Sequence, residues 1–173
     1  LIYLDTGAMY RAVTWFIQKE NINPDNEKEL VKALSNLNVD INLADSGIQH
    51  VMLNDQEISN EIRHPKVTAA VSKIASKAAV REKLTAQQKF IGLKGGIVAE
   101  GRDIGSTVFP DAELKVFLTA SSEERARRRA NDLISQGFSV PNLQELENEI
   151  QERDKIDSTR EIAPLVKAKD AKE

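Results

Sequence analysis

Apolar and polar positions along the chain predict alternating strands and helices. The residues from Leu1 to Leu4 are apolar without a break, which predicts a strand buried on both faces, as in a parallel sheet. We predict two further core strands, one that begins at Ile97 to Ala99 and one from Leu114 to Thr119. Because helical segments separate these strands, we expect an α/β fold with right-handed crossovers.

Helical spacing of apolar residues fills most of the chain between the strands. Thr6 is expected to cap the helix that follows the first strand. A short second helix is predicted through Leu30 and Leu34. Two more are predicted later in the chain, through Val67 to Ala78 and through Val80 to Ile91.

Capping motifs locate two helices in the last third of the chain. Ser121 and Glu124 have the spacing of a capping box, and Gly137 is expected to end the helix that they start. The segment from Asn142 to Glu145 is expected to cap the next helix.

Between the second and third helices the pattern changes to that of a small antiparallel meander. Val39 to Leu43 alternates apolar and polar residues, which predicts a half-exposed strand. A turn is predicted at Asp45 to Gly47, a second strand from Ile48 to Leu53, and another turn at Asn54 and Asp55. We interpret this region as an insert in the α/β chain.

Composition limits the kinds of site that the chain can form. Its 173 residues carry no cysteine and a net charge of −3, so neither a thiolate metal site nor a general attraction to nucleic acid is expected. No apolar run reaches the ~18 residues of a membrane span. His50 and His64 lie in different elements without a carboxylate cluster, so we expect surface histidines and no protein-held metal.

The predicted helix from Leu143 to about Arg160 carries a face that turns from apolar to charged. Steps of three and four residues give its members: Leu143, Leu146, Ile150, Arg153, Asp157 and Arg160. Charges that face inward need an anion or a polar cavity, so this face suits a phosphate and neighbouring hydroxyl groups. A solvated helix end with salt bridges explains the same pattern, and the two interpretations remain open at this point.

Two short motifs follow predicted strands, at the edge where ligands of such sheets bind. In Gly101 to Gly105 the glycines allow a close backbone approach, Arg102 suits a phosphate and Asp103 accepts hydrogen bonds. An ordinary turn with a salt bridge is the alternative. Thr6 to Arg11 places a hydroxyl and an arginine at a helix N-terminus, which is an anion site or a plain helix cap.

The run from Arg125 to Arg129 contains four arginines on one predicted helix. Basic clusters attract phosphate backbones, but Glu123 and Glu124 precede this one and no aromatic side chains are interleaved with it. We interpret the run as facing a compact polyphosphate or solvent rather than a nucleic acid polymer.

The order of the motifs is more specific than any one of them. The sequence resembles bacterial cytidylate kinase, a P-loop nucleoside monophosphate kinase, from Leu1 to about Asp170. The matching segments are Leu4 to Arg11, Val98 to Gly105, Phe109 to Ala112, Phe117 to Ala126, Gln136 to Phe138, Glu152 to Asp154, Asp157 to Arg160 and Ala163 to Leu165.

The resemblance implies a fold and a division of the chain. It implies a P-loop NTPase-type parallel sheet flanked by helices, with an antiparallel β-containing monophosphate-binding insert and a helical lid. The core would comprise residues 1–38 and 91–173, and the insert residues 39–90. Residues 121–141, within the core span, would form the lid that closes over ATP.

The resemblance also implies a reaction, the transfer of the γ-phosphoryl group of ATP to CMP or dCMP. The residues that match acceptor-binding positions are Thr6, Tyr10, Arg11, Ser72, Arg81, Arg102, Asp103, Asp157 and Arg160. Among them, Ser72, Arg81 and Asp103 match positions that read cytosine, and Asp157 matches the residue that holds the sugar hydroxyls. Catalytic positions are matched by Arg102, Arg153 and Arg160, and ATP-binding positions by Arg125, Arg128 and Arg129.

Partners and location follow from the same resemblance. We expect ATP with Mg²⁺ held mainly by the nucleotide phosphates, and a cytoplasmic monomer that contacts neither a nucleic acid polymer nor a membrane. No G-x-x-x-x-G-K-[ST] motif occurs in these residues, so we expect this segment alone to bind CMP without efficient transfer. The alternatives are a kinase for UMP or AMP, and a non-catalytic module that binds nucleotides or RNA.

Overall fold

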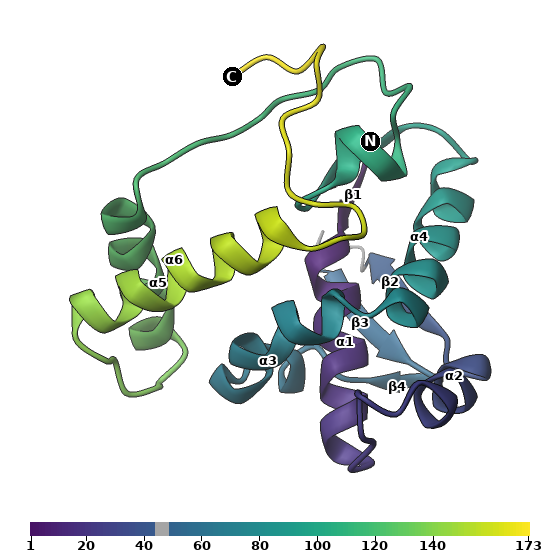
Figure 1. The fold of residues 1–173 in the computed structure, drawn as a ribbon, viewed down its shortest axis with the longest axis horizontal. Coiled ribbons are helices and arrows are strands. Elements are labelled where there is room, and N and C mark those ends of the chain that lie inside the picture. Colours follow the sequence, from purple (N-terminus) through teal and green to yellow (C-terminus); the bar gives the residue numbers. More distant parts are fainter. Residues whose placement is uncertain (44–48) are drawn as a thin grey trace.

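A computed structural model describes residues 1–43 and 49–173 of the chain. Figure 1 shows helix α1 at the centre, with the small sheet and helix α2 on one side of it and helices α5 and α6 forming a separate pair. In chain order the elements are β1 (Ile2–Asp5), α1 (Thr6–Lys19), α2 (Glu27–Ser35), β2 (Val39–Leu43), β3 (Gln49–Leu53), β4 (Gln56–Glu57), the 3-10 turn η1 (Glu61–Arg63), α3 (Pro65–Ala75), α4 (Ala78–Gly92), β5 (Ile97–Glu100), the π-helical turn η2 (Ile104–Val108), α5 (Ser122–Ser135) and α6 (Leu143–Thr159).

The first sheet is a parallel pair of strands, β1 and β5, whose register runs from Ile2 beside Ile97 to Asp5 beside Glu100. The predicted strand at the start of the chain is therefore confirmed. Its predicted burial on both faces is wrong, because Leu4 is buried whereas Ile2 and Tyr3 are about half exposed. Within the described residues β1 has β5 as its one neighbour in the sheet, so part of the strand stays accessible.

The predicted core strand from Leu114 to Thr119 does not form. This stretch runs extended beside the C-terminal segment, as Figure 1 shows, but pairs with it only through a bridge between Val116 and Lys172. Leu118 is 87% exposed. A strand is stabilised by a ladder over several residues and by neighbours that cover its faces, and the described residues supply neither here.

The second sheet is the antiparallel meander that the alternating pattern predicted. Strand β3 pairs with β2 from Leu53 beside Val39 to Gln49 beside Leu43, and with the short strand β4 on its other side. The predicted turn at Asp45 to Gly47 and the first residue of the second predicted strand lie outside the described residues. Asn54 and Asp55 form the second turn with positive φ angles of 45° and 68°.

Helix α1 begins at Thr6, but its cap is Asp5 and not Thr6 as predicted. The Asp5 carboxylate accepts a hydrogen bond from the Ala8 backbone N–H at 2.9 Å. Thr6 already lies in the first turn, where its hydroxyl donates to the backbone carbonyl of Glu100 at 2.7 Å. That hydrogen bond ties the start of α1 to the end of β5.

The predicted caps of α5 and α6 are confirmed. The Ser121 hydroxyl accepts from the Glu124 backbone N–H at 3.2 Å, and the Asn142 side chain accepts from that of Glu145 at 2.8 Å. Gly137 follows α5 with a φ of +76°, the left-handed conformation that commonly ends a helix.

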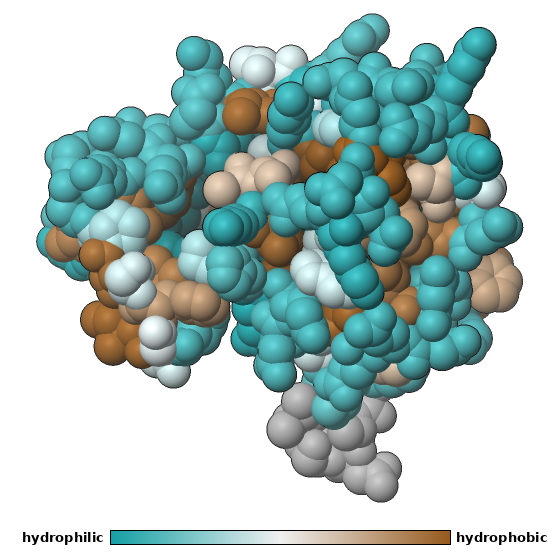
Figure 2. All heavy atoms as spheres, turned by 90° about the horizontal axis from the view of Figure 1, so that it is seen from below, coloured by the Kyte–Doolittle hydropathy of each residue, from teal (hydrophilic) through white to brown (hydrophobic). Residues whose placement is uncertain are grey.

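Two hydrophobic cores form in the described residues. The larger one packs α1 against the meander and against α2, α3 and α4. The smaller one joins α5 to α6 through Ala126, Ala130, Leu133 and Leu146. In the space-filling view of Figure 2, hydrophilic side chains cover much of one face and apolar surface appears between them. In the described part of the chain, no helix is both long enough and apolar enough to cross a lipid bilayer.

Candidate functional site

A narrow cavity lies at the carboxyl ends of β1 and β5, the edge at which the predicted motifs were expected to meet. Helices α1, α3, α4 and α6 and the loop after β5 surround it. Its lining residues are Thr6, Gly7, Tyr10, Val71, Ser72, Ala75, Arg81, Gly101, Arg102, Asp103, Arg153, Asp157 and Arg160. They include every residue predicted to bind the acceptor except Arg11, together with the predicted catalytic Arg153.

The cavity is too small for a nucleotide in this conformation. Its volume is about 40 Å³, whereas pockets that hold small-molecule ligands have volumes of about 300–1,000 Å³. A nucleotide therefore fits only after the side chains that line the cavity move apart.

An ion-pair cluster around Asp103 fills one side of the cavity. Arg81, from α4, donates to one carboxylate oxygen of Asp103, and Arg160, at the end of α6, donates to the other at 3.3 Å. All three side chains are buried. Arg81 also donates to the Ala75 carbonyl at 3.3 Å and Arg160 to that of Ala163 at 2.8 Å. The buried charges are thus paired and hydrogen-bonded, as buried charges must be.

Asp157 is the second carboxylate of the cavity, and three arginines surround it. Arg102 lies 3.3 Å from it, Arg160 3.5 Å and Arg153 3.8 Å. Asp157 and Arg160 are buried, so the charged face of the last helix points inward and the interpretation as a solvated helix end is wrong for them. Leu143, at the other end of that face, is half exposed rather than buried.

Burial and like charges change the acid–base properties of the lining groups. Burial lowers the pKa of Arg153, and the nearby Arg102 guanidinium lowers it further. Burial likewise lowers the pKa of Arg160. Because arginines that have lost water and face other cations gain most from a bound anion, these shifts favour phosphate binding. Burial raises the pKa of Tyr10, whose ring lies 5.2 Å from the Arg81 guanidinium.

Ser72 and Gly101 contribute to the cavity wall in different ways: Ser72 offers a hydroxyl, and Gly101 permits a close approach. The Ser72 hydroxyl is buried and has no hydrogen-bond partner among the described residues, so it is available to a ligand. At Gly101 a Cβ atom would lie 2.4 Å from the Thr6 hydroxyl oxygen. A glycine is therefore required for the Thr6 hydroxyl to reach the strand end.

Arg11 lies beside the cavity without lining it. Its guanidinium donates to the Asp5 carboxylate at 2.8 Å, and both side chains are about a quarter exposed. Its positive charge nevertheless contributes to lowering the pKa of Arg153.

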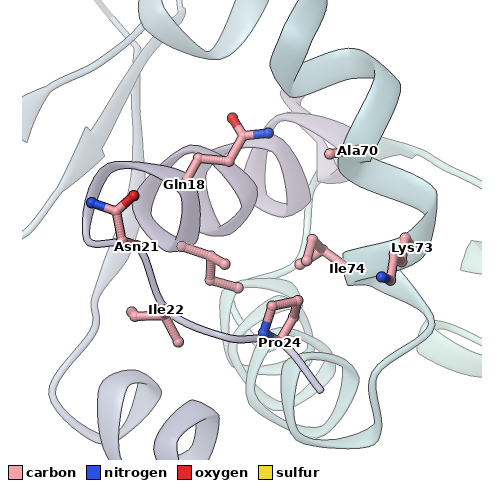
Figure 3. Close-up of a pocket in the computed structure, with 8 residues that line it drawn as sticks. Gln18, Asn21, Ile22, Pro24, Ala70, Lys73 and Ile74 are labelled. Carbon is pink, nitrogen blue, oxygen red and sulfur yellow. The ribbon is translucent and has the colours of Figure 1, made fainter. Parts of the chain in front are cut away.

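A second hollow is larger but contains none of the predicted site residues. It has a volume of about 460 Å³ and lies between the end of α1, the segment after it and α3. Figure 3 shows Ile22, Pro24 and Ile74 around its apolar interior and Lys73 at one side. Lys73 is the one cation among the described lining residues of this hollow, whereas four arginines line the smaller cavity. The smaller cavity is therefore the better candidate for binding a phosphorylated ligand.

Comparison with known proteins identifies the family of this chain. The sequence profile of the family described as cytidylate kinase matches residues 1–173. The chain belongs to the cytidylate kinase family. Two curated relatives, both named "Bifunctional pantoate ligase/cytidylate kinase", illustrate the similarity. One from Prochlorococcus marinus is 63% identical over 173 residues, and one from Synechococcus sp. (strain CC9605) is 56% identical over 173 residues.

The alignment covers all of this chain but only part of each relative. It spans 33% of the Prochlorococcus marinus protein and 36% of the Synechococcus sp. protein. The chain thus spans about a third of the length of the curated relatives that it matches.

Helix α5 of this cytidylate kinase family member carries arginines that face different sides. Arg125 faces α6, where it forms two hydrogen bonds with the Asp154 carboxylate. Arg128 is exposed and pairs with Glu124 of its own helix at 2.8 Å. Arg129 is partly exposed. The arginines predicted to bind ATP therefore do not converge in this conformation.

Asp154 is the residue at this site that sequence reasoning did not single out. It lies within the matched segment Glu152 to Asp154, and a step of four from Ile150 reaches it as directly as a step of three reaches Arg153. Its distance of 3.9 Å to Arg102 brings it to the rim of the cavity.

Proposed function

We propose that this chain forms the acceptor site of a kinase that transfers the γ-phosphoryl group of ATP to CMP or dCMP. Of the two activities in the relatives' names, the kinase is the one that we assign to this chain. The observation that carries the proposal is the convergence on one cavity of Thr6, Ser72, Arg81, Asp103 and other predicted acceptor residues from separate segments.

The base is read by Ser72, Arg81 and Asp103 in this proposal. Cytosine presents an exocyclic amino group where uracil presents a carbonyl oxygen. The Asp103 carboxylate accepts a hydrogen bond from the amino group and repels the carbonyl, and the unpartnered Ser72 hydroxyl adds a second polar contact. A site that depends on such hydrogen bonds discriminates strongly between bases.

The sugar and phosphate are bound by the cluster around Asp157. Asp157 accepts hydrogen bonds from the sugar hydroxyls, while Arg102, Arg153 and Arg160 bind the acceptor phosphate. Without a nucleotide these arginines are paired with carboxylates. Nucleotide binding therefore exchanges ion pairs within the protein for contacts with the ligand, so no charge is left buried without a partner.

Opening of the cavity requires movement between segments. Arg81 belongs to residues 39–90, which we propose as the monophosphate-binding insert. Arg160 and Asp103 belong to the proposed core of residues 1–38 and 91–173. Because the ion pair between Arg81 and Asp103 crosses this boundary, we propose that the insert moves away from the core to admit CMP and closes over it afterwards.

Phosphoryl transfer itself requires in-line positioning and compensation of charge on the moving group. Arg102, Arg153 and Arg160 supply positive charge from the acceptor side. The arginines of α5, in the proposed lid of residues 121–141, supply it from the ATP side when the lid closes and excludes water. In the described residues no three His, Cys, Asp or Glu side chains form a metal-binding group, so we propose that Mg²⁺ is held mainly by the nucleotide phosphates.

An acceptor-competition assay tests the proposed function. The purified full-length protein receives ATP, Mg²⁺ and either CMP, dCMP, UMP or AMP, and diphosphate products are separated by chromatography. We expect CDP and dCDP to form at least tenfold faster than UDP or ADP. Faster phosphorylation of AMP or UMP, or no transfer to any acceptor, would contradict the proposal. A steep salt dependence of binding to single-stranded RNA would favour the RNA-binding alternative.

A further inference from the structure

Asp154 holds arginines from two different segments at one carboxylate. Arg125 of α5 binds it with two parallel hydrogen bonds, one of them 3.1 Å from Nη1 to Oδ1. Arg102, from the loop after β5, places its Nη2 atom 3.9 Å from the same Oδ1 atom. The bidentate geometry fixes the plane of the Arg125 guanidinium as well as its position.

The carboxylate also compensates the repulsion between the two cations. Arg102 and Arg125 both approach Asp154, so their guanidinium groups lie close to each other, and all three side chains are only about a third exposed. The hydrogen bonds to Asp154 raise the pKa of Arg125. Without the negative charge the two arginines would repel each other and lose their common orientation.

Helix α6 connects this pair to the acceptor cavity. Arg102 lies between two carboxylates of α6, Asp154 at 3.9 Å and Asp157 at 3.3 Å. Asp157 is buried in the cavity, whereas Asp154 lies one turn earlier on the side of α5. Arg102 thereby links the proposed acceptor-phosphate site to the carboxylate that binds Arg125 of α5.

Two buried guanidinium N–H groups near Asp154 are available to bind an anion. The Nε atoms of Arg125 and Arg153 are buried and have no hydrogen-bond partner within residues 1–43 and 49–173. A buried N–H group without a partner is costly, and a phosphate oxygen is an acceptor that would satisfy it. This set of guanidinium groups is thus incomplete without an anion.

Packing of α5 against α6 does not depend on Asp154. The two helices share the apolar core around Leu133 and Leu146. The Ser122 hydroxyl donates to Glu147 at 2.7 Å, and Gln151 donates to Ser122 at 3.2 Å. These contacts lie on other turns of the helices, so loss of the Asp154 charge should leave the helix pair folded.

We propose that Asp154 is a positioning residue for phosphoryl transfer, which holds Arg125 of α5 beside Arg102 so that both face the transferred phosphoryl group. This inference rests on the proposed function. Asp154 need not touch either nucleotide, because it acts through the arginines that it orients.

The test compares Asp154→Asn with Glu152→Gln in the purified full-length protein. Glu152 is an exposed residue of the same helix, and its substitution removes the same charge. We expect Asp154→Asn to lower kcat by about 10- to 100-fold, since small misplacements of catalytic groups have effects of this size. The KM for CMP should change less than threefold, and Asp154→Glu should recover part of the loss. Glu152→Gln should retain wild-type kcat within twofold.

A double-mutant cycle separates positioning from a merely structural role. If Asp154 acts by orienting Arg125, Asp154→Asn should lower kcat much less in an Arg125→Gln protein than in the wild type. The fold-loss in kcat should be at least five times smaller in that background. The inference would be overturned if Asp154→Asn lowered kcat by the same factor in the wild type and in the Arg125→Gln protein. It would also be overturned if Asp154→Asn retained as much kcat as Glu152→Gln. A wild-type protein without CMP kinase activity would instead contradict the proposed function.

Discussion

Arg81 and Asp103 form a buried ion pair that joins helix α4, within residues 39–90, to the loop after β5. Asp103 is shared with Arg160, so one carboxylate compensates two buried guanidinium groups. Arg81 and Asp103, which we propose as readers of cytosine, therefore also link α4 to the loop after β5.

The first prediction concerns the stability of this cluster. Asp103→Asn leaves Arg81 and Arg160 without their shared counter-charge, and loss of one partner of a buried pair costs about 3–5 kcal/mol. Urea unfolding followed by circular dichroism should show a fall of this size in the free energy of unfolding. Asp132→Asn, at an exposed position of α5, should change it by less than about 0.5 kcal/mol. A similarly small effect for Asp103→Asn would contradict the importance of the cluster.

Ser72→Ala separates ligand binding from folding. The Ser72 hydroxyl is buried without a partner among the described residues, so its removal should leave the free energy of unfolding unchanged or slightly higher. The Kd for CMP should rise about tenfold, which corresponds to the loss of one hydrogen bond of about 1.4 kcal/mol. Calorimetric titration and thermal unfolding of the same preparations provide both values. Destabilisation without a change in Kd would show that the hydroxyl has a structural partner instead.

A pair of glycine substitutions tests the close approach at the strand end. In Gly101→Ala the new Cβ would lie 2.4 Å from the Thr6 hydroxyl oxygen and 2.9 Å from Ile104 side-chain atoms, so we expect a loss of about 1–3 kcal/mol. In Gly105→Ala the nearest atom is 3.2 Å away, on the flexible side chain of Lys115. This control should lose less than about 1 kcal/mol. Equal losses in urea unfolding would contradict the account of Gly101.

Two substitutions at Thr6 test its hydrogen bond to the Glu100 carbonyl. Thr6→Val keeps the shape of the side chain but removes the donor, and we expect a loss of about 1 kcal/mol or more because the carbonyl is left without it. Thr6→Ser keeps the donor and should stay closer to the wild-type free energy of unfolding. If Thr6→Ser lost more free energy of unfolding than Thr6→Val, the methyl group rather than the hydroxyl would stabilise this position.

Features with a local cause were predictable from the sequence. The meander follows from alternation and turn residues, and the starts of α5 and α6 follow from caps at Ser121 and Asn142. The charged face of α6 was predictable from helical spacing alone. In each case the residues that determine the structure are neighbours along the chain.

Features that depend on distant partners were not predictable. The segment from Leu114 to Thr119 has the composition of a strand, but strand formation also requires a neighbour, which composition does not report. The sequence predicts Thr6 as the cap of α1, but the Thr6 hydroxyl donates instead to the backbone carbonyl of Glu100, 94 residues away. The closure of the cavity by Arg81, Asp103 and Arg160 likewise joins residues far apart in sequence.

The most direct test of the account is a calorimetric titration of the purified full-length protein with CMP, dCMP, UMP and AMP. We predict saturable binding of CMP and dCMP, at least tenfold tighter than that of UMP or AMP, and loss of this preference in Asp103→Asn. A folded protein that binds none of the four nucleotides, or that prefers AMP, would contradict the assignment of the cavity as a cytidine monophosphate site.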